Sequence, residues 1–196
     1  MKLAKTAIAL AMGTLFSVGA FAQTTGSEVQ RDVNQQQRIE QGLQSGQLST
    51  REAAKLEKEQ SGVDRMESNA LKDGNLSAAE KARIQNAQNK VSRDISREKH
   101  DAQVGNPNSA SSKRMQADVQ RNINQEKRIE QGVQSGQLTN REVGSLERGQ
   151  ARVDRSEALA GRNGHVNAGE QARIQHKENI QSARVYNKKH NERTRP

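Results

Sequence analysis

The chain has no cysteine, and it has few aromatic or large aliphatic residues. Without cysteine it can form neither disulfides nor thiolate metal sites, and a lipid anchor on a cysteine is excluded. Tryptophan is also absent, and both phenylalanines lie within the first 22 residues. Among Phe, Tyr and Trp, residues 23–196 therefore contain only Tyr186. Leu, Ile, Val and Met supply only 28 of residues 23–196. Such a composition is typical of disorder, so any folded core must be small and aliphatic.

The first 22 residues have the pattern of a bacterial secretory signal peptide. Lys2 and Lys5 precede a short apolar run that ends in Ala-Phe-Ala at positions 20–22. A basic start, an apolar middle and a small-x-small exit are what a signal peptidase recognises. The run is shorter than the roughly 20 residues that span a bilayer. We therefore predict cleavage after Ala22 and a mature protein that lies in the periplasm or outside the cell and has no transmembrane span.

An internal duplication covers most of the remaining chain. Residues 29–101 align without a gap with residues 119–191, and 36 of these 73 positions are identical. A disordered linker has little reason to keep its length so strictly, so the duplication favours two folded units. The predicted organisation is a signal peptide at 1–22, helical unit 1 at 23–101, a linker at 102–112, helical unit 2 at 113–191 and a basic tail at 192–196.

Apolar spacing within each unit predicts helices. In the first unit we expect helices over about residues 27–44, 50–71 and 78–99, with equivalents in the second unit. In the third of these helices, for example, Ile84 precedes an apolar residue at i+7 and another at i+11. Such steps place residues on one helix face, and no segment alternates with period two for long enough to form a strand. The predicted fold class is all-α, with two tandem three-helix units arranged as helical hairpins or a bundle.

The junctions between the predicted helices carry helix-end signals. Gly46 suits a left-handed helix C-terminus, and Ser49 with Glu52 forms the pattern of a capping box at the next helix start. The same arrangement of glycine, cap residue and glutamate recurs at positions 74–80, 136–142 and 164–170.

The same junctions are similar to the second half of an EF-hand calcium loop, which has glycine at position six and glutamate at position twelve. The first half of the loop is missing, because the loop around Gly74 has Asn69 and Leu71 where carboxylates should bind the ion. We therefore expect no metal site and no cofactor. The alternative is a protein that binds calcium or another divalent cation through degenerate loops. Its ligands would be Asp73, Glu80, Glu52, Glu142 and Glu170.

No other motif carries chemistry. The chain lacks the signatures of a nucleophilic hydrolase, a P-loop or a dinucleotide fold, so we expect a protein that is not an enzyme. The repeated pairs Asp64-Arg65 and Asp154-Arg155 are expected to form salt bridges at helix surfaces or between helices. The histidines are expected to be solvated residues at helix ends.

The charge is basic, and it is concentrated at one end. The formal net charge of +9 falls to +7 without residues 1–22, and residues 184–196 alone carry +4. A basic tail can bind anionic surfaces without sequence specificity. Acids interrupt the basic helix faces, so sequence-specific nucleic-acid binding is not expected. The sequence favours an exported binding or structural protein that contacts an anionic envelope surface or a protein partner. The partner and the oligomeric state stay open, self-association included.

The string Arg-Ile-Glu-Gln-Gly-x-Gln-Ser-Gly-Gln-Leu-Ser/Thr-x-Arg-Glu begins at Arg38 and again at Arg128. With the later Lys-His pair, it resembles small exported bacterial helical-repeat proteins that are uncharacterised. The resemblance covers both units and implies export and duplication. It implies no activity, ligand or site residue.

Overall fold

The computed structural model describes the backbone of residues 18–193 and the side chains of residues 25–193. This part of the chain is all-helical and contains no strand, which confirms the predicted all-α class. The helices are α1 (Val18–Ser45), α2 (Thr50–Ala70), α3 (Ala78–Lys99), α4 (Ala110–Gln134), α5 (Asn140–Gly161) and α6 (Ala168–Lys189), and a 3-10 turn, η1 (Leu71–Asp73), follows α2.

The predicted signal peptide lies mostly outside the described residues. Residues 1–17 are not described, and α1 begins at Val18, so the predicted cleavage point after Ala22 falls within this helix. Cleavage and export stay predictions. Among the described helices, none is long and apolar enough to cross a membrane.

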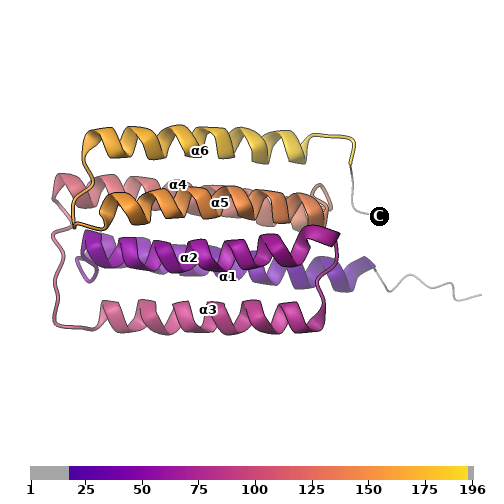
Figure 1. Ribbon diagram of the computed structural model, residues 1–196, viewed down its shortest axis with the longest axis horizontal. Helices are drawn as coiled ribbons and strands as arrows, with labels where there is room; N and C mark the ends of the chain where they lie inside the picture. The colour runs from indigo at the N-terminus through magenta and orange to yellow at the C-terminus, as the bar shows by residue number, and fades with distance from the viewer. Residues whose placement is uncertain (1–17, 194–196) are drawn as a thin grey trace, which may run out of the picture.

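The six helices form a layered bundle (Figure 1). The helix pairs α2–α5 and α1–α4 share the most extensive contacts. The outer helix α3 packs against α1 and α2, and α6 packs against α4 and α5 on the opposite side. Each three-helix set comes from one copy of the duplication, so the two copies meet through their inner helix pairs.

An approximate two-fold relationship connects the copies where α2 crosses α5. A Cβ atom added to Gly161 would lie 2.7 Å from the Ala54 Cβ, and one added to Gly144 would lie 2.8 Å from the Leu71 Cβ. An offset of 90 relates Ala54 to Gly144 and Leu71 to Gly161, so the two close contacts are equivalent. The early part of each helix meets the late part of the other, so α2 and α5 run antiparallel.

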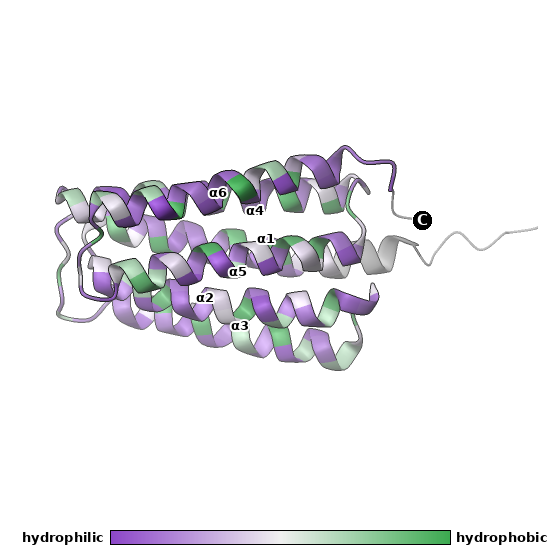
Figure 2. Cartoon of the chain, turned by 45° about the horizontal axis from the view of Figure 1, so that its top comes forward, coloured by the Kyte–Doolittle hydropathy of each residue, from purple (hydrophilic) through white to green (hydrophobic). Residues whose placement is uncertain are grey.

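The aliphatic core is shared between the copies. Figure 2 shows hydrophobic positions recurring between hydrophilic ones along the helices. One buried cluster joins Leu56 and Ile95 of the first copy to Met115 and Ile123 of the second, and another joins residues of both copies around Leu146. Neither copy therefore encloses a hydrophobic core of its own.

The helix junctions form as the sequence predicts. Gly46, Gly74, Gly136 and Gly164 all adopt positive φ, which costs glycine no Cβ clash. Complete capping boxes begin α2, α3, α5 and α6, and in the last of these an asparagine replaces the hydroxyl residue. These local hydrogen bonds set where the helices begin and end.

Two helix boundaries differ from those predicted, whereas α2 ends at Ala70, close to the predicted end at about residue 71. Helix α1 begins at Val18, not near residue 27. Helix α4 begins at Ala110, inside the predicted linker 102–112. Ser109 explains this earlier start, because its side chain accepts a hydrogen bond from the Ser112 backbone at 3.1 Å.

Candidate functional site

Opposite charges are separated between the interior and the surface of this bundle. Sixteen of the 23 Asp and Glu residues are buried, whereas no Lys or Arg among the described side chains is buried. Removing a carboxylate from water costs several kcal/mol unless a partner compensates it. The interior of the protein therefore needs protons, hydrogen-bond donors or cations to balance its acids.

Most of the fully buried acids lie on the four inner helices. They are Glu28 and Asp32 on α1, Glu57, Asp64 and Glu67 on α2, Asp118 and Glu126 on α4, and Glu147, Asp154 and Glu157 on α5. The acids of α2 follow one another at steps of seven and three, so they share one helix face. The acids of α5 occupy the equivalent positions. Because α2 packs against α5, the two acidic stripes face each other.

One group of carboxylates is compact. Glu57, Asp154 and Glu157 each offer a carboxylate oxygen, and these atoms lie within 4.8 Å of one another. All three residues are buried. The Gln36 amide donates to Glu57 Oε2 at 3.0 Å. The Asn122 amide donates to Asp154 Oδ1 at 3.3 Å and to the two Glu157 oxygens at 3.0 and 2.9 Å. Two carboxamides thus orient three carboxylates.

The duplication produces a second, more acidic group. The equivalents of Glu57, Asp154 and Glu157 are Glu147, Asp64 and Glu67. The positions equivalent to the two carboxamides hold acids: Asp32 is equivalent to Asn122, and Glu126 is equivalent to Gln36. In this group the Gln88 amide donates to Asp32 Oδ1 at 3.0 Å and to Glu67 Oε1 at 3.1 Å.

Several polar atoms in this interior have no hydrogen-bond partner. Glu147 is fully buried, and neither of its carboxylate oxygens accepts a hydrogen bond. Gln60, also fully buried, has no partner for either amide atom. Leaving one buried polar group unsatisfied costs about 1–3 kcal/mol, and more for a charged group. A ligand that bound these atoms would remove that cost.

Burial shifts the acid–base equilibria of these groups. It raises the pKa of Glu57 to about 7, and that of Asp32 also to about 7. The pKa values of Asp64, Glu147 and Glu157 lie well above their ordinary values, first because of burial and then because of neighbouring carboxylates. The folded interior therefore keeps protons at pH values at which exposed carboxyls have lost them.

One buried acid at the edge of the interior has an ion-pair partner. Arg121 Nε lies 2.8 Å from Glu178 Oε2, and the arginine is partly exposed. Burial raises the pKa of Glu178 to about 8, although Arg121 lowers it in part. This pair shows how the fold can bring a surface cation to a buried acid. Among the described residues, neither Glu147 nor Asp154 has such an ion pair.

The structure does not bring the sequence-predicted loop ligands together. Asp73 Oδ1 accepts from the Asn75 backbone at 2.8 Å, and the carboxylates of the other candidates accept hydrogen bonds at helix starts. These helix-start residues are Glu52, Glu80, Glu142 and Glu170. Of the five, only Glu52 lies in a group of three acids, with Glu98 and Asp101.

The expectation of salt bridges for Asp64-Arg65 and Asp154-Arg155 is wrong for the two aspartates. Both are buried, and neither takes part in an ion pair between the described residues. Arg65 instead donates to the Ser61 carbonyl at 3.1 Å. A sequence signal for the interior group did exist. The pattern Glu-x-x-Gln-x-x-x-Asp-x-x-Glu starts at Glu57 and at Glu147, on the same turns as the aliphatic stripe.

The donor set restricts what this interior could hold. Carboxylate and carboxamide oxygens are the available ligands, because the chain has no cysteine and its four histidines are exposed. Oxygen ligands suit hard cations such as Ca²⁺ and Mn²⁺ more than soft or thiophilic metals.

No protein-family model, curated protein or solved structure matches this chain. The resemblance to exported helical-repeat proteins therefore stays a prediction.

Proposed function

We propose that this chain is an exported, non-enzymatic binding protein that holds hard cations in the carboxylate-rich interior between its two repeats. The observation that carries the proposal is the burial of many acids without any buried Lys or Arg among the described side chains. A bound divalent ion would neutralise two carboxylates at once and would occupy oxygens that otherwise have no partner.

The compact group of Glu57, Asp154 and Glu157 is the best-formed binding position. Its three carboxylates come from both repeats, so an ion there would also tie α2 to α5. The Gln36 and Asn122 amides already orient these carboxylates through one face. A calcium ion takes six to eight oxygens at about 2.3–2.6 Å, which three carboxylates and the unpartnered oxygens nearby can supply with small adjustments.

The position differs from the degenerate EF-hand loops that the sequence suggests. In those loops the glutamates accept hydrogen bonds from backbone amides at helix starts. The interior acids have few such donors, so they gain more from an ion. Because they are shielded from solvent, loading and release require the helices to open transiently, and we expect slow exchange.

Thermal melting of residues 23–196 tests the proposal. The melting temperature is measured by circular dichroism at pH 7.5 in EDTA, and then with excess Ca²⁺ or Mn²⁺. A ligand at 100 times its Kd stabilises the folded state by about 2.7 kcal/mol, and for a chain of this size that corresponds to a rise of roughly 5–10 °C. Equal melting temperatures with EDTA and with either ion would contradict the proposal.

Matched variants locate the site. Glu57→Gln with Asp154→Asn and Glu157→Gln keeps the side-chain shapes and removes three charges, so the cation-induced rise should be lost. The control is Asp73→Asn with Glu80→Gln, which changes a half-loop but preserves a capping side chain. The control should respond to the ions as the parent does. If the control lost the cation-induced rise and the triple variant kept it, the ion would be assigned to the half-loop.

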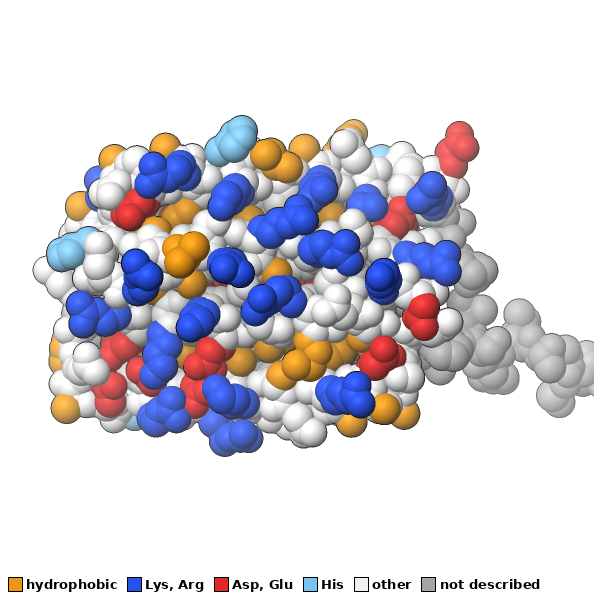
Figure 3. All heavy atoms as spheres, in the orientation of Figure 1, with side chains coloured by type: hydrophobic (Ala, Val, Ile, Leu, Met, Phe, Trp, Pro, Cys, Tyr) orange, Lys and Arg blue, Asp and Glu red, His pale blue; other side chains and the backbone are white. Residues whose placement is uncertain are grey.

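A second function is favoured by the surface charge. Because most acids are buried, Lys and Arg dominate the face shown in Figure 3. On α5 and α6 a shallow groove combines Arg152, Lys177 and Arg184 with the exposed apolar residues Leu159 and Ile180. This combination suits anionic envelope lipids. Co-sedimentation with anionic vesicles that weakens with salt, and no binding to zwitterionic vesicles, is the expected result.

A further inference from the structure

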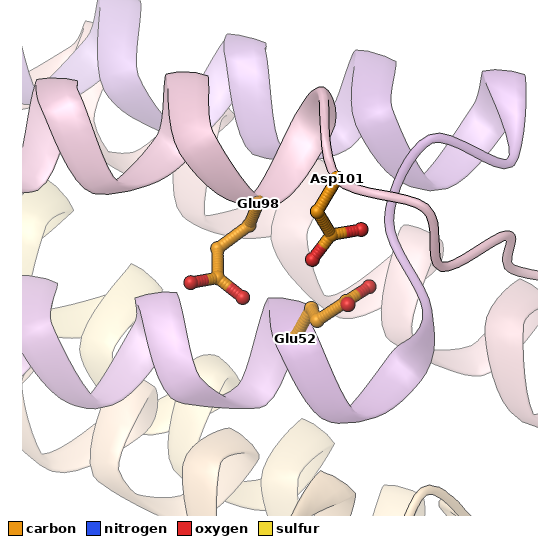
Figure 4. Close-up of side chains that lie close together, drawn as sticks. All are labelled: Glu52, Glu98 and Asp101. Atoms are coloured by element: carbon orange, nitrogen blue, oxygen red, sulfur yellow. The ribbon is translucent and has the colours of Figure 1, made fainter.

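A third group of acids lies at one end of the bundle, away from the two groups of interior carboxylates. Glu52 lies in the first turn of α2, Glu98 in the last turn of α3, and Asp101 just beyond that helix. One carboxylate oxygen from each lies within 4.8 Å of the others. Figure 4 shows Glu98 and Asp101 extending from the α3 end toward Glu52.

Glu52 has one carboxylate oxygen that is not satisfied. Its Oε2 accepts from the Ser49 backbone at 2.8 Å and thereby completes the capping box. Its Oε1 is buried and has no hydrogen-bond partner, and the residue is only 4 % exposed. A buried carboxylate oxygen beside two further acids needs a cation or a donor.

Two cationic side chains near this group, Lys55 and Arg97, form ion pairs with Glu98. Lys55 Nζ lies 2.8 Å from Glu98 Oε1, and the Arg97 guanidinium lies 3.3 Å from the same oxygen. Asp101 Oδ1 accepts from the Gln103 backbone at 2.8 Å. Arg97 also pairs with Asp94, at 2.7 Å, so the two cations do not neutralise all three carboxylates, and neither cation is within ion-pair distance of Glu52.

The second repeat fills the equivalent place with its own side chains. Glu142 corresponds to Glu52, and its Oε1 accepts from the Asn191 amide at 2.7 Å. Asn191 corresponds to Asp101, and Lys188 corresponds to Glu98. Burial raises the pKa of Glu142, but the hydrogen bonds from Asn191 and Thr139 and the charge of Lys188 outweigh burial and lower it.

We infer that Glu52, Glu98 and Asp101 form a peripheral site for a divalent cation of the calcium class. The cation takes the place that an amide and an ammonium group hold in the other repeat. Asp101 is exposed, so water can complete the six to eight oxygens that calcium requires. The site has three carboxylates and open coordination positions. We therefore expect a Kd for calcium like that of weak extracellular sites, about 0.1–1 mM. The site shares no residue with the interior group, so it does not rest on the proposed function.

The repeat supplies the variants for the test. Glu98→Lys with Asp101→Asn copies the second repeat into the first. Lys188→Glu with Asn191→Asp makes the reverse change. Each full mature chain is titrated with CaCl₂ and followed by the backbone amide signals of Ser49 and Gln103, and by those of Thr139 and Arg193, in heteronuclear NMR spectra.

In the parent we expect the Ser49 and Gln103 signals to move with CaCl₂ and the Thr139 signal to stay. The first variant should lose the movement at Ser49, and the reverse variant should gain movement at Thr139. Unmoved Ser49 and Gln103 signals in the parent up to about 10 mM calcium, ten times the weakest expected Kd, would overturn the inference. If the first variant fails to fold, the parent titration and the reverse variant still decide.

The side-chain amide signal of Gln60 separates this site from the interior one. If Ser49 responds and Gln60 does not, the peripheral site stands without the proposed function. If only Gln60 responds, the interior site stands and the peripheral one is refuted. Lys55→Gln adds a further check, because removing the ammonium from Glu98 should tighten calcium binding several-fold. A residue cluster held only by its salt bridges would instead show no calcium response in this variant.

Discussion

Gly161 on α5 and Ala54 on α2 are in such close contact that a side chain at Gly161 would place its Cβ 2.7 Å from the Ala54 Cβ. The duplication repeats this contact between Gly144 and Leu71. Glycine near each end of α5 therefore sets how closely the two repeats approach each other, and with it how near the two acidic stripes lie.

We predict that Gly161→Ala destabilises the protein although alanine is the better helix former. The new methyl group would meet Ala54, the Met115 side chain and the Thr50 carbonyl, and crowding of this kind costs about 1–3 kcal/mol. Gly62→Ala is the matched control, because nothing lies within 4 Å of a Cβ at this position in α2. It should stabilise by up to about 1 kcal/mol. Chemical denaturation measures both, and similar gains for the two variants would contradict the close packing of α2 on α5.

The buried acids predict an unusual dependence of stability on pH. The pKa values of Asp32 and Glu57 rise to about 7 in the folded state, whereas those of ordinary carboxyls are near 4. Between these values the folded protein binds more protons than the unfolded chain, so the free energy of unfolding falls as pH rises. The metal-free protein should therefore melt at a higher temperature at pH 5 than at pH 7.5.

Asp94 acts in the opposite sense, but in another pH range. Burial raises its pKa, yet the Lys90 and Arg97 contacts outweigh burial and bring the pKa to about 2. The ionised Asp94 adds to the free energy of unfolding above pH 4, and this stabilisation is lost only between about pH 4 and pH 2. It therefore does not mask the fall in stability that the interior acids cause above pH 5. Melting curves in EDTA at several pH values measure the effect. A melting temperature that rises from pH 5 to pH 7.5 would show that the interior acids are compensated in another way.

A single neutral substitution should stabilise the metal-free protein. In Glu147→Gln the side chain keeps its size and loses the charge that has no hydrogen-bond partner. The new amide can also donate to the neighbouring Glu126, whose charge raises the pKa of Glu147. We expect a gain of about 1–3 kcal/mol at pH 7.5 in EDTA, and a smaller gain at pH 5, because burial and neighbouring carboxylates hold the pKa of Glu147 well above its ordinary value.

The control for Glu147→Gln is Glu192→Gln, which removes an exposed charge from the C-terminal segment and should change the melting temperature little. A variant that is less stable than the parent at pH 7.5 in EDTA would show that the Glu147 carboxylate has a partner in solution.

The local features of the fold could be predicted from the sequence, because they depend on neighbours in the chain. The helix starting at Ala78 and its capping box at Ser77 and Glu80 need only residues within one turn. Helix α1 was predicted too short because its first residues lie before the apolar spacing begins. Ala110 was placed in a linker because the Ser109 cap was not recognised.

The interior could not be predicted in the same way, because burial of an acid depends on the partner helix. Asp64 and Asp154 stand beside arginines in the sequence, which suggests salt bridges at helix surfaces or between helices. In the fold α2 packs against α5, so both aspartates are buried, and Arg65 donates to the Ser61 carbonyl instead. The peripheral site needed the three-dimensional structure as well, because Glu52 and Asp101 meet only when α3 folds back along α2.

The shared core predicts that one repeat is not a stable domain. Leu56 and Ile95 of the first repeat pack in the same cluster as Met115 and Ile123 of the second, and the inner helices bury their apolar faces against the other copy. Residues 23–105 alone would expose these faces together with their acidic stripe. We expect this half to melt far below residues 23–196, or to show little helix at all by circular dichroism.

The two-fold relationship also predicts how such a half would recover stability. Because equivalent surfaces of the two repeats face each other, two copies of residues 23–105 can pair through α1 and α2 as the repeats do in the intact chain. The melting temperature of the half should then rise with its concentration, whereas that of the full mature chain should not. Sedimentation measurements provide the independent check. A half that is monomeric and melts with the full chain would mean that each repeat folds alone, and that the acids between the repeats are exposed to solvent.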